Sequence, residues 1–156
     1  MSNTKNGKDL VVSSTAFEQE GSIPAKYTCE GEEINPPLHI ENIPDGTKTL
    51  AIIAEDPDTA KGIFDHWVAW NIPVKNDIAE NSSPGISGIN GSGKTGYHPP
   101  CPPTGNHRYY FYVYALDKAL SLTTGANKKD LQIAMGNHIL AKGSLMGRYQ
   151  KVKQHA

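Results

Sequence analysis

Three polar side chains near the middle of the chain have the types and the placement needed to bind a small anion. Asp56 follows an apolar run, His66 comes ten residues later beside Trp67, and His107 precedes an aromatic run. Pro57 restricts its own backbone and favours extended backbone at Asp56, so this carboxylate is held in one place. A carboxylate that accepts an imidazole N–H fixes the tautomer of the ring and leaves the other ring nitrogen for a ligand. If their elements share one sheet, these side chains can converge at one edge and, with backbone N–H groups of a Gly/Pro-rich loop, bind phosphate or carboxylate.

Each of these residues also has an ordinary structural interpretation. Asp56-Pro57-Asp58 is typical of a turn, and a His beside a Trp is often a partly buried side chain whose hydrogen bonds are satisfied. Arg108, directly after His107, is suited to an ion pair or to carbonyl bonds that hold loops together. Spacing alone therefore leaves open whether these residues form a binding site.

The set of His66, His107 and Asp56 also allows a hydrolase or a metal-dependent enzyme, because imidazoles and carboxylates bind metals and act as general acids and bases. The chain has no G-x-S-x-G elbow and no nucleophile with an obvious base. Cys101 could be a nucleophile activated by His107, but prolines flank it and no helix N-terminus is predicted there to activate the thiol. We therefore predict a protein that is not an enzyme, with no catalytic residue, no metal site and no cofactor.

Residues 88–95 match the phosphate-loop pattern GxxxxGK[ST], with Lys94 and Thr95 at its end. Nucleotide binding through this pattern requires a buried strand before the loop and a helix that begins at the Lys. The preceding residues 81–85 do not predict a strand, and the following residues 96–103 contain four prolines, which prevent a helix. We therefore predict a surface loop and reject a nucleotide hydrolase.

The elements that must position these side chains are mostly strands. Short apolar, β-branched or aromatic runs bounded by turn residues predict strands at residues 10–14, 38–42, 50–54, 66–72 and 109–116. The continuous apolar run at 50–54 suggests a strand that is covered on both faces. Alternation at 109–116 places Tyr110, Tyr112 and Tyr114 on one face and Tyr109 and Phe111 on the other.

One long helix is predicted late in the chain. Asn127 can cap it, with Asp130 three residues later in a box-like arrangement. The positions at helical spacing are Leu131, Met135, His138 and Leu140. Gly143 is the predicted end of this helix.

Length and composition indicate one mostly β domain. The chain has 156 residues, which predicts a single domain, at residues 10–156. Residues 1–9 are polar and lack periodicity, which predicts a disordered or tag-like tail. The 15 glycines and 11 prolines favour strands and loops over a helical bundle.

Charge and hydropathy argue against several partners. The net charge of −1 provides no basic surface for nucleic acid. The longest apolar stretch, residues 109–116, is far shorter than the roughly 20 residues of a membrane span, so no integral membrane protein is expected. The first ten residues are polar and predict no signal peptide. Two cysteines, Cys29 and Cys101, are too few for a disulfide framework, so we expect reduced thiols in a cytoplasmic protein.

Motifs spread over most of the chain, from Ser14 to Tyr149, resemble those of the phosphatidylethanolamine-binding protein family, in its bacterial and archaeal branch of Raf kinase inhibitor-like proteins. The matching segments are Ala16-Phe17, Ile23-Pro24, KYTCEG from Lys26, NPPL from Asn35, Asp56-Pro57-Asp58, His66-Trp67-Val68, NIP from Asn71, Gly96-Tyr97, PCPP from Pro100, GNHRY from Gly105, Ala134-Met135, HILA from His138, LMG from Leu145 and Tyr149. Their occurrence in family order makes the resemblance specific.

The resemblance implies a β-sandwich around a large antiparallel sheet with a C-terminal helical segment. It also implies a pocket for phosphate-like anions, including a phospholipid head group. The matching pocket residues are Asp56, His66, Cys101, Pro102, His107 and Tyr109. Asp58, Trp67 and Arg108 match supporting positions.

Two departures from the family pattern lie at the rim of this pocket. Ala60 stands where the family usually has a proline, and Pro99-Pro100 replaces the usual Gly-Pro before the cysteine. Pocket width and ligand choice are the properties that these changes affect. The resemblance further implies a homodimer and, as partners, a protein kinase or protease that the protein inhibits or modulates.

Overall fold

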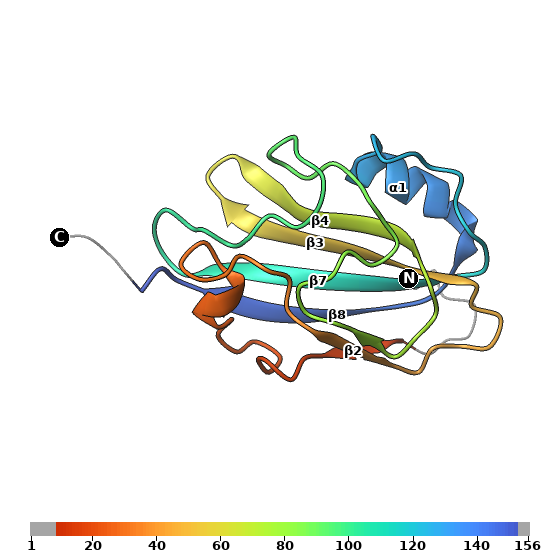
Figure 1. Cartoon of the computed structure of the whole chain (residues 1–156), viewed down its shortest axis with the longest axis horizontal. Helices are drawn as coiled ribbons and strands as arrows, with labels where there is room; N and C mark the ends of the chain where they lie inside the picture. The colour runs from red at the N-terminus through yellow and green to blue at the C-terminus, as the bar shows by residue number, and fades with distance from the viewer. Residues whose placement is uncertain (1–8, 153–156) are drawn as a thin grey trace.

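Two antiparallel sheets form most of the structure, a computed structural model that describes residues 9–152 (Figure 1). The smaller sheet has the strand order β1-β2-β5 and the larger one the order β6-β4-β3-β7-β8. The strands are β1 (Val11–Ser13), β2 (Leu38–Glu41), β3 (Thr49–Thr59), β4 (Gly62–Ile72), β5 (Asp77–Ile78), β6 (Ile86–Ser87), β7 (His107–Leu116) and β8 (Ile139–Tyr149). The helical elements are η1 (Ala25–Tyr27), α1 (Lys128–Met135) and η2 (Gly136–His138). The predicted mostly β fold around a large antiparallel sheet is confirmed; the predicted tail at residues 1–9, apart from Asp9, lies outside the described residues.

The central strand β3 is buried on both faces, as its apolar run predicts. Leu50, Ile52 and Ala54 pack into the core between the two sheets. Ala51 and Ile53 pack into a second core on the opposite face. The helix α1 covers this second face with Leu131 and Met135, which are fully buried. The large sheet is therefore the middle layer, with the small sheet on one side and α1 on the other (Figure 1).

The strand β7 alternates as predicted. Tyr109, Phe111 and Val113 are buried between the sheets, whereas Tyr112 and Tyr114 are half-buried against the core beneath α1. The strand begins two residues earlier than predicted, so His107 and Arg108 are part of its ladder with β8. The side chains that could do chemistry are thus attached to a rigid strand.

The helix α1 begins as predicted and ends earlier. Asn127 Oδ1 accepts the backbone N–H of Asp130, and the Asp130 carboxylate accepts the backbone N–H of Asn127, which completes the capping box. The helix stops at Met135, before Gly136 with its positive φ of 34°. The predicted continuation to Gly143 is wrong, because the segment from Ile139 onwards pairs along the length of β7.

An N-terminal segment lies along the outer edge of β8. The backbone N–H groups of Leu10, Glu20 and Ile23 donate to the carbonyls of Lys142, Met146 and Arg148, at 3.0, 2.6 and 2.8 Å. The side-chain amide of Gln19 also bonds to β8: its N–H donates to the carbonyl of Ser144, and its oxygen accepts the backbone N–H of Met146. This close approach needs glycine on β8, since a Cβ at position 143 would lie 2.1 Å from the Leu10 carbonyl oxygen.

Candidate functional site

A pocket of about 140 Å³ opens at one end of the large sheet, where the turn from β3 to β4, the start of β7 and the loop at residues 98–103 meet. All six residues predicted for the pocket line it: Asp56, His66, Cys101, Pro102, His107 and Tyr109. The three predicted supporting residues, Asp58, Trp67 and Arg108, do not line it. That the pocket binds a phosphate-like anion stays a prediction.

The buried carboxylate of Asp56 forms the base of the pocket. Its Oδ2 accepts a hydrogen bond of 2.7 Å from Nδ1–H of His107, and its Oδ1 accepts the backbone N–H of Asp58 at 2.7 Å. Both oxygens are therefore occupied, and the side chain of Asp56 is only 3% exposed. Because Nδ1 of His107 is bonded to the carboxylate, Nε2 is the nitrogen that this ring offers to a ligand.

Asp58 and Arg108 form the support for this arrangement. The guanidinium of Arg108 contacts both Asp58 oxygens, with Nε–Oδ2 at 2.9 Å and Nη2–Oδ1 at 2.7 Å, and its backbone N–H donates to Oδ2. The hydrogen bonds from Arg108 lower the pKa of Asp58 to about 2. The pair joins the end of β3 to the start of β7 and neutralises the arginine next to the pocket.

His66 is held by the loop across from it. Its Nδ1 lies 2.7 Å from the carbonyl oxygen of His98, and the backbone N–H of His98 donates to the carbonyl of His66 at 2.7 Å. A carbonyl can only accept, so Nδ1 carries the proton and Nε2 keeps its lone pair. Burial lowers the pKa of His66 to about 4, which keeps this ring neutral at pH 7.

Aromatic rings form the walls around His66. Phe64 and Tyr109 approach the imidazole edge-on, with ring centroids at 4.8 and 5.2 Å. The Tyr109 ring also stacks with His107, at 6.4 Å between centroids. Burial, followed by the nearby Asp56 carboxylate, raises the pKa of the Tyr109 hydroxyl, so it stays protonated. Trp67, on the same strand as His66, instead packs edge-on against Tyr97 beneath the loop.

Four further residues line the pocket that sequence reasoning did not predict: Thr59, Phe64, His98 and Pro103. Of these, His98 is the informative omission, since its backbone fixes the tautomer of His66. Its position three residues before Cys101, in a loop already connected with the pocket, is the signal that could have identified it.

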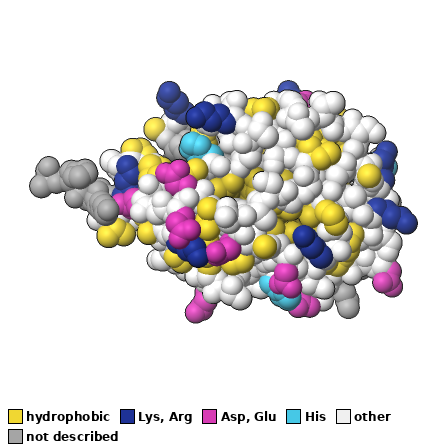
Figure 2. Space-filling view, viewed as in Figure 1, with side chains coloured by type: hydrophobic (Ala, Val, Ile, Leu, Met, Phe, Trp, Pro, Cys, Tyr) yellow, Lys and Arg dark blue, Asp and Glu magenta, His cyan; other side chains and the backbone are white. Residues whose placement is uncertain are grey.

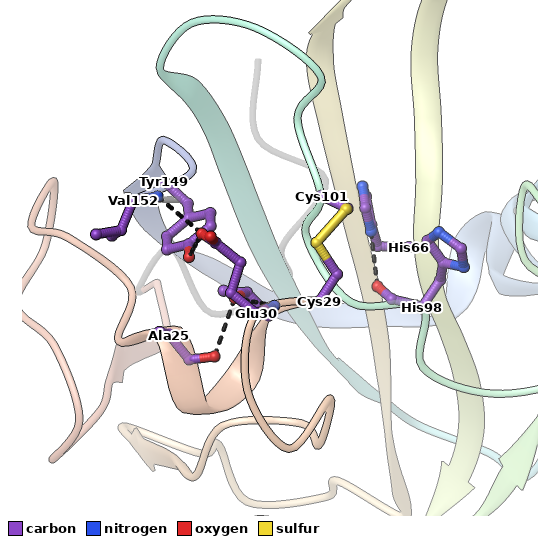
Figure 3. The surroundings of a disulfide bond; sticks show 9 residues. Ala25, Cys29, Glu30, His66, His98, Cys101, Tyr149 and Val152 are labelled. Atoms are coloured by element: carbon purple, nitrogen blue, oxygen red, sulfur yellow. Dashed lines mark hydrogen bonds between the residues drawn. A yellow bond between two sulfur atoms is a disulfide. The ribbon is translucent and has the colours of Figure 1, made fainter. Parts of the chain in front are cut away.

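The two cysteines are joined, so the predicted reduced thiols are wrong. Cys29 and Cys101 form a disulfide across a sequence separation of 72 residues (Figure 3). The backbone N–H of Cys29 also donates to the carbonyl of Pro100 at 3.1 Å. The count of two cysteines excluded a framework of several bridges but not a single bridge. The disulfide ties the pocket rim at Cys101 to the segment that follows η1.

The residue after Cys29 extends this connection to the end of β8. Glu30 accepts the hydroxyl of Tyr149 and, at 2.8 Å, the backbone N–H of Val152 (Figure 3). Tyr149 in turn lies opposite His107 in the ladder between β7 and β8. Two neighbouring residues therefore hold one side of the pocket in place: Cys29 through the disulfide and Glu30 through its hydrogen bonds to the end of β8.

The loop at residues 88–95 does not have the geometry of a phosphate loop. The two-residue strand β6 precedes it, which the sequence did not predict, but residues 88–106 contain no helix. Asn90 Oδ1 accepts the backbone N–H groups of Ser92 and Lys94, so these donors are already used. Lys94 itself is exposed and does not line the pocket described above.

The surface shows charges of both signs. The face seen in Figure 2 carries Lys and Arg as well as Asp and Glu side chains, in line with the net charge of −1. None of the helices in residues 9–152 has the length and apolar character needed to cross a membrane. Within the same residues, no group of three or more His, Cys, Asp or Glu side chains is placed to hold a metal ion.

Comparison with known proteins gives a consistent result over most of the chain. The sequence profile described as phosphatidylethanolamine-binding protein matches residues 13–150. A protein of Pyrococcus abyssi is 44% identical over 156 residues, covering 93% of this chain and 88% of the relative, and one of Chlamydia trachomatis is 44% identical over 149 residues, covering 91% and 99%. Both carry the name UPF0098 protein, which states no activity.

Two solved structures have the same fold. One is a phosphatidylethanolamine-binding protein homologue of Chlamydia trachomatis, CT736, with a TM-score of 0.89, 42% identity and coverage of 92% of this chain and 98% of that chain. The other is Escherichia coli YbcL, described as a member of the mammalian family, with a TM-score of 0.84, 22% identity and coverage of 92% and 99%. At this lower identity, YbcL supports the fold alone.

Proposed function

The chain belongs to the phosphatidylethanolamine-binding protein family, and on this premise we propose that it is a non-enzymatic protein whose pocket binds one phosphate-like anion. The observation that carries the proposal is the Asp56–His107 pair in the pocket. The buried carboxylate accepts Nδ1–H of His107 and so turns Nε2 of this ring towards a ligand, where an Nε2–H can donate to an anion. The pocket volume of about 140 Å³ suits a group of the size of phosphate.

The enzyme alternative has less support. Cys101 lines the pocket but is bonded to Cys29, so it offers no thiol to His107. Asp56 has both oxygens occupied by Asp58 N–H and His107, so it is placed to orient an imidazole rather than to take a proton from a substrate. A binding role requires nothing further from these residues.

The test is an NMR titration of the imidazole resonances with inorganic phosphate. We expect shifts at His66 and His107 and a clear loss of affinity in His66→Ala and in His107→Ala. His39→Ala, which removes a half-buried imidazole on β2 that is bonded to Asp77, is the matched control and should leave the affinity unchanged. The absence of any shift at His66 and His107, or shifts that cluster at Lys94, would contradict the proposal.

The proposal extends to the molecule that carries the phosphate and to the role of the protein in the cell. The phosphate can be that of a phospholipid head group or of a soluble phosphorylated ligand, and binding can serve to inhibit or modulate a protein kinase or protease. A cytoplasmic location also remains a proposal, and reduced cysteines no longer argue for it, because disulfides persist mainly in oxidising compartments.

We further propose a homodimer. The chain mass is 16.9 kDa, and light scattering at micromolar concentration measures the assembly directly. A mass near twice this value supports a dimer, and a mass near 17 kDa contradicts it.

A further inference from the structure

We infer that the pocket selects an oxyanion that carries its own O–H group, such as hydrogen phosphate or the monoanion of a phosphomonoester, over an oxyanion of the same shape without a proton. The inference rests on the proposed function and deepens it by naming the class of ligand. It follows from the hydrogen-bonding roles of His66 and His107, which both line the pocket, and from the small number of N–H donors around them.

His66 contributes an acceptor. Its Nδ1–H is used by the carbonyl of His98, so the nitrogen on the other edge of the ring, Nε2, has a lone pair and no proton (Figure 3). The groups whose charges act on this ring are His98 from the loop, Asp56 from β3 and Asp65 from β4, while Phe64 and Tyr109 pack against it. The two carboxylates favour a second proton, but burial outweighs them and the ring stays neutral at pH 7.

His107 contributes the one donor that an anion needs. Its Nδ1–H is bonded to Asp56, and in the complex that we infer its other nitrogen, Nε2, donates an N–H to the anion. The buried Asp56 carboxylate lies directly beside His107, so the pair has no surplus of positive charge that would attract a second negative oxygen. The guanidinium of Arg108 is bound by both oxygens of Asp58, and no Lys or Arg lines the pocket.

The rim of the pocket adds few donors. Residues 99–103 consist of four prolines and Cys101, so only Cys101 has a backbone N–H in this segment. The departure from the family pattern at Pro99 removes one of these N–H groups. The Gly/Pro-rich loop that the sequence suggested as a source of N–H donors is therefore poor in them at the rim.

The remaining polar side chains in the wall face other groups of the protein. The hydroxyl of Thr59 donates to the carbonyl of Gly62, and the Tyr109 hydroxyl, whose pKa is raised by burial and then by Asp56, lies near that carboxylate. Burial lowers the pKa of His98, which favours the neutral ring with its single N–H.

An oxyanion with an O–H satisfies both histidines at once. Its negative oxygen accepts Nε2–H of His107, and its O–H donates to the lone pair of His66 Nε2. An oxyanion without a proton would place an oxygen lone pair against the lone pair of His66 and leave that nitrogen unpaired in a mostly buried site.

The test compares methyl phosphate with methyl sulfate, whose monoanions have the same shape and charge and differ by one O–H. At pH 6, about half of the phosphomonoester is the monoanion, since its second pKa is about 6. We expect calorimetry to show at least about tenfold tighter binding of the methyl phosphate monoanion than of methyl sulfate, which is the scale expected from one unpaired buried acceptor. Inorganic phosphate and sulfate form a second pair, and a preference for inorganic phosphate without binding of methyl phosphate would assign the site to the free ion rather than to an ester.

Two protein measurements connect this preference to His66. In His66→Gln the side-chain amide can donate an N–H, so the ratio between the two ligands should fall towards one, whereas the control His39→Gln should keep the wild-type ratio. If His66→Gln does not fold, the ¹⁵N shifts of His66 in the wild-type protein report the tautomer directly, and we expect a proton on Nδ1 and none on Nε2. Equal binding of methyl phosphate and methyl sulfate, or a proton on Nε2, would overturn the inference while leaving anion binding intact. Failure of all four ligands to bind would overturn the proposed function together with it.

Discussion

Removing the disulfide between Cys29 and Cys101 should lower the free energy of unfolding by about 4 kcal/mol. The change is Cys29→Ser with Cys101→Ser, which replaces each sulfur with an oxygen and leaves the side chain otherwise alike. Reduction of the wild-type protein by a dithiol is the second route to the same open chain.

The magnitude follows from the length of chain that the bridge closes. The cysteines are 72 residues apart, and closing a loop of this length removes about 15 cal/mol/K of entropy from the unfolded chain, which corresponds to about 4 kcal/mol at 25 °C. A single-domain protein is typically stable by about 5–15 kcal/mol, so the loss is a large part of the total. The native state should change little, because the Cys29 N–H bond to Pro100 and the Glu30 contacts are independent of the sulfurs.

Urea unfolding measured by tryptophan fluorescence is a suitable assay, since Trp67 and Trp70 are both fully buried and report loss of the core. For a slope of about 2 kcal/mol/M, the transition midpoint should fall by about 2 M. The single variant Cys29→Ser should behave as the double variant does, because either change opens the loop. The reasoning is refuted if the double variant loses less than about 1 kcal/mol, or if the denatured wild-type protein has two free thiols before any reductant is added.

Three further perturbations test other parts of the structure. Asn127→Ala removes the N-cap of α1 and should cost about 1 kcal/mol in thermal unfolding, whereas no loss would show that the capping box does not stabilise the helix. Lys94→Ala should leave phosphate affinity and stability unchanged, and ATP hydrolysis that this change abolishes would show that the loop at residues 88–95 binds nucleotide. Burial lowers the pKa of His66 from 6.5 to about 4. As the pH falls, the imidazole therefore binds a proton in the unfolded chain before it does so in the folded protein, and the free energy of unfolding should decrease between a pH above 6.5 and pH 4. Urea unfolding at pH 7 and pH 5 should show a smaller acid-induced loss in His66→Gln than in the wild-type protein, and equal losses would contradict the assignment.

Much of the sheet could be predicted from local pattern. The apolar run at residues 50–54 predicts a strand that is buried on both faces, and the alternation along β7 predicts two different faces. Both predictions are confirmed, because side chains of a strand alternate between the two cores that lie on either side of the sheet. The pocket residues could be named only with the help of the family resemblance, since the spacing of Asp56, His66 and His107 does not show that their strands are neighbours.

The strand β8 could not be predicted, because its beginning continues the helical spacing of α1. Leu131, Met135 and His138 fit a helix, and Leu140 and Gly143 extend the same pattern. The long ladder with β7 overrides this local preference, and Gly143 serves to admit the Leu10 carbonyl rather than to end a helix.

The disulfide and His98 were missed for a common reason. Each depends on the path of a loop that joins distant strands, and no periodicity connects Cys29 with Cys101 or His98 with His66. Proline-rich loops carry no repeating signal of this kind, so their side-chain neighbours emerge only from the folded chain.

The N-terminal segment that runs along β8 has a consequence for self-association. An exposed edge strand of eleven residues is a template for pairing with other chains and a common origin of aggregation. Here residues 10–23 cover the edge of β8 and form hydrogen bonds with its residues Lys142, Ser144, Met146 and Arg148. Deleting the chain through Ile23 would leave these groups open, so such a truncated protein should precipitate or form fibrils even if its pocket is intact. For the same reason, a dimer of the full chain cannot join its sheets through β8 unless this segment is first displaced.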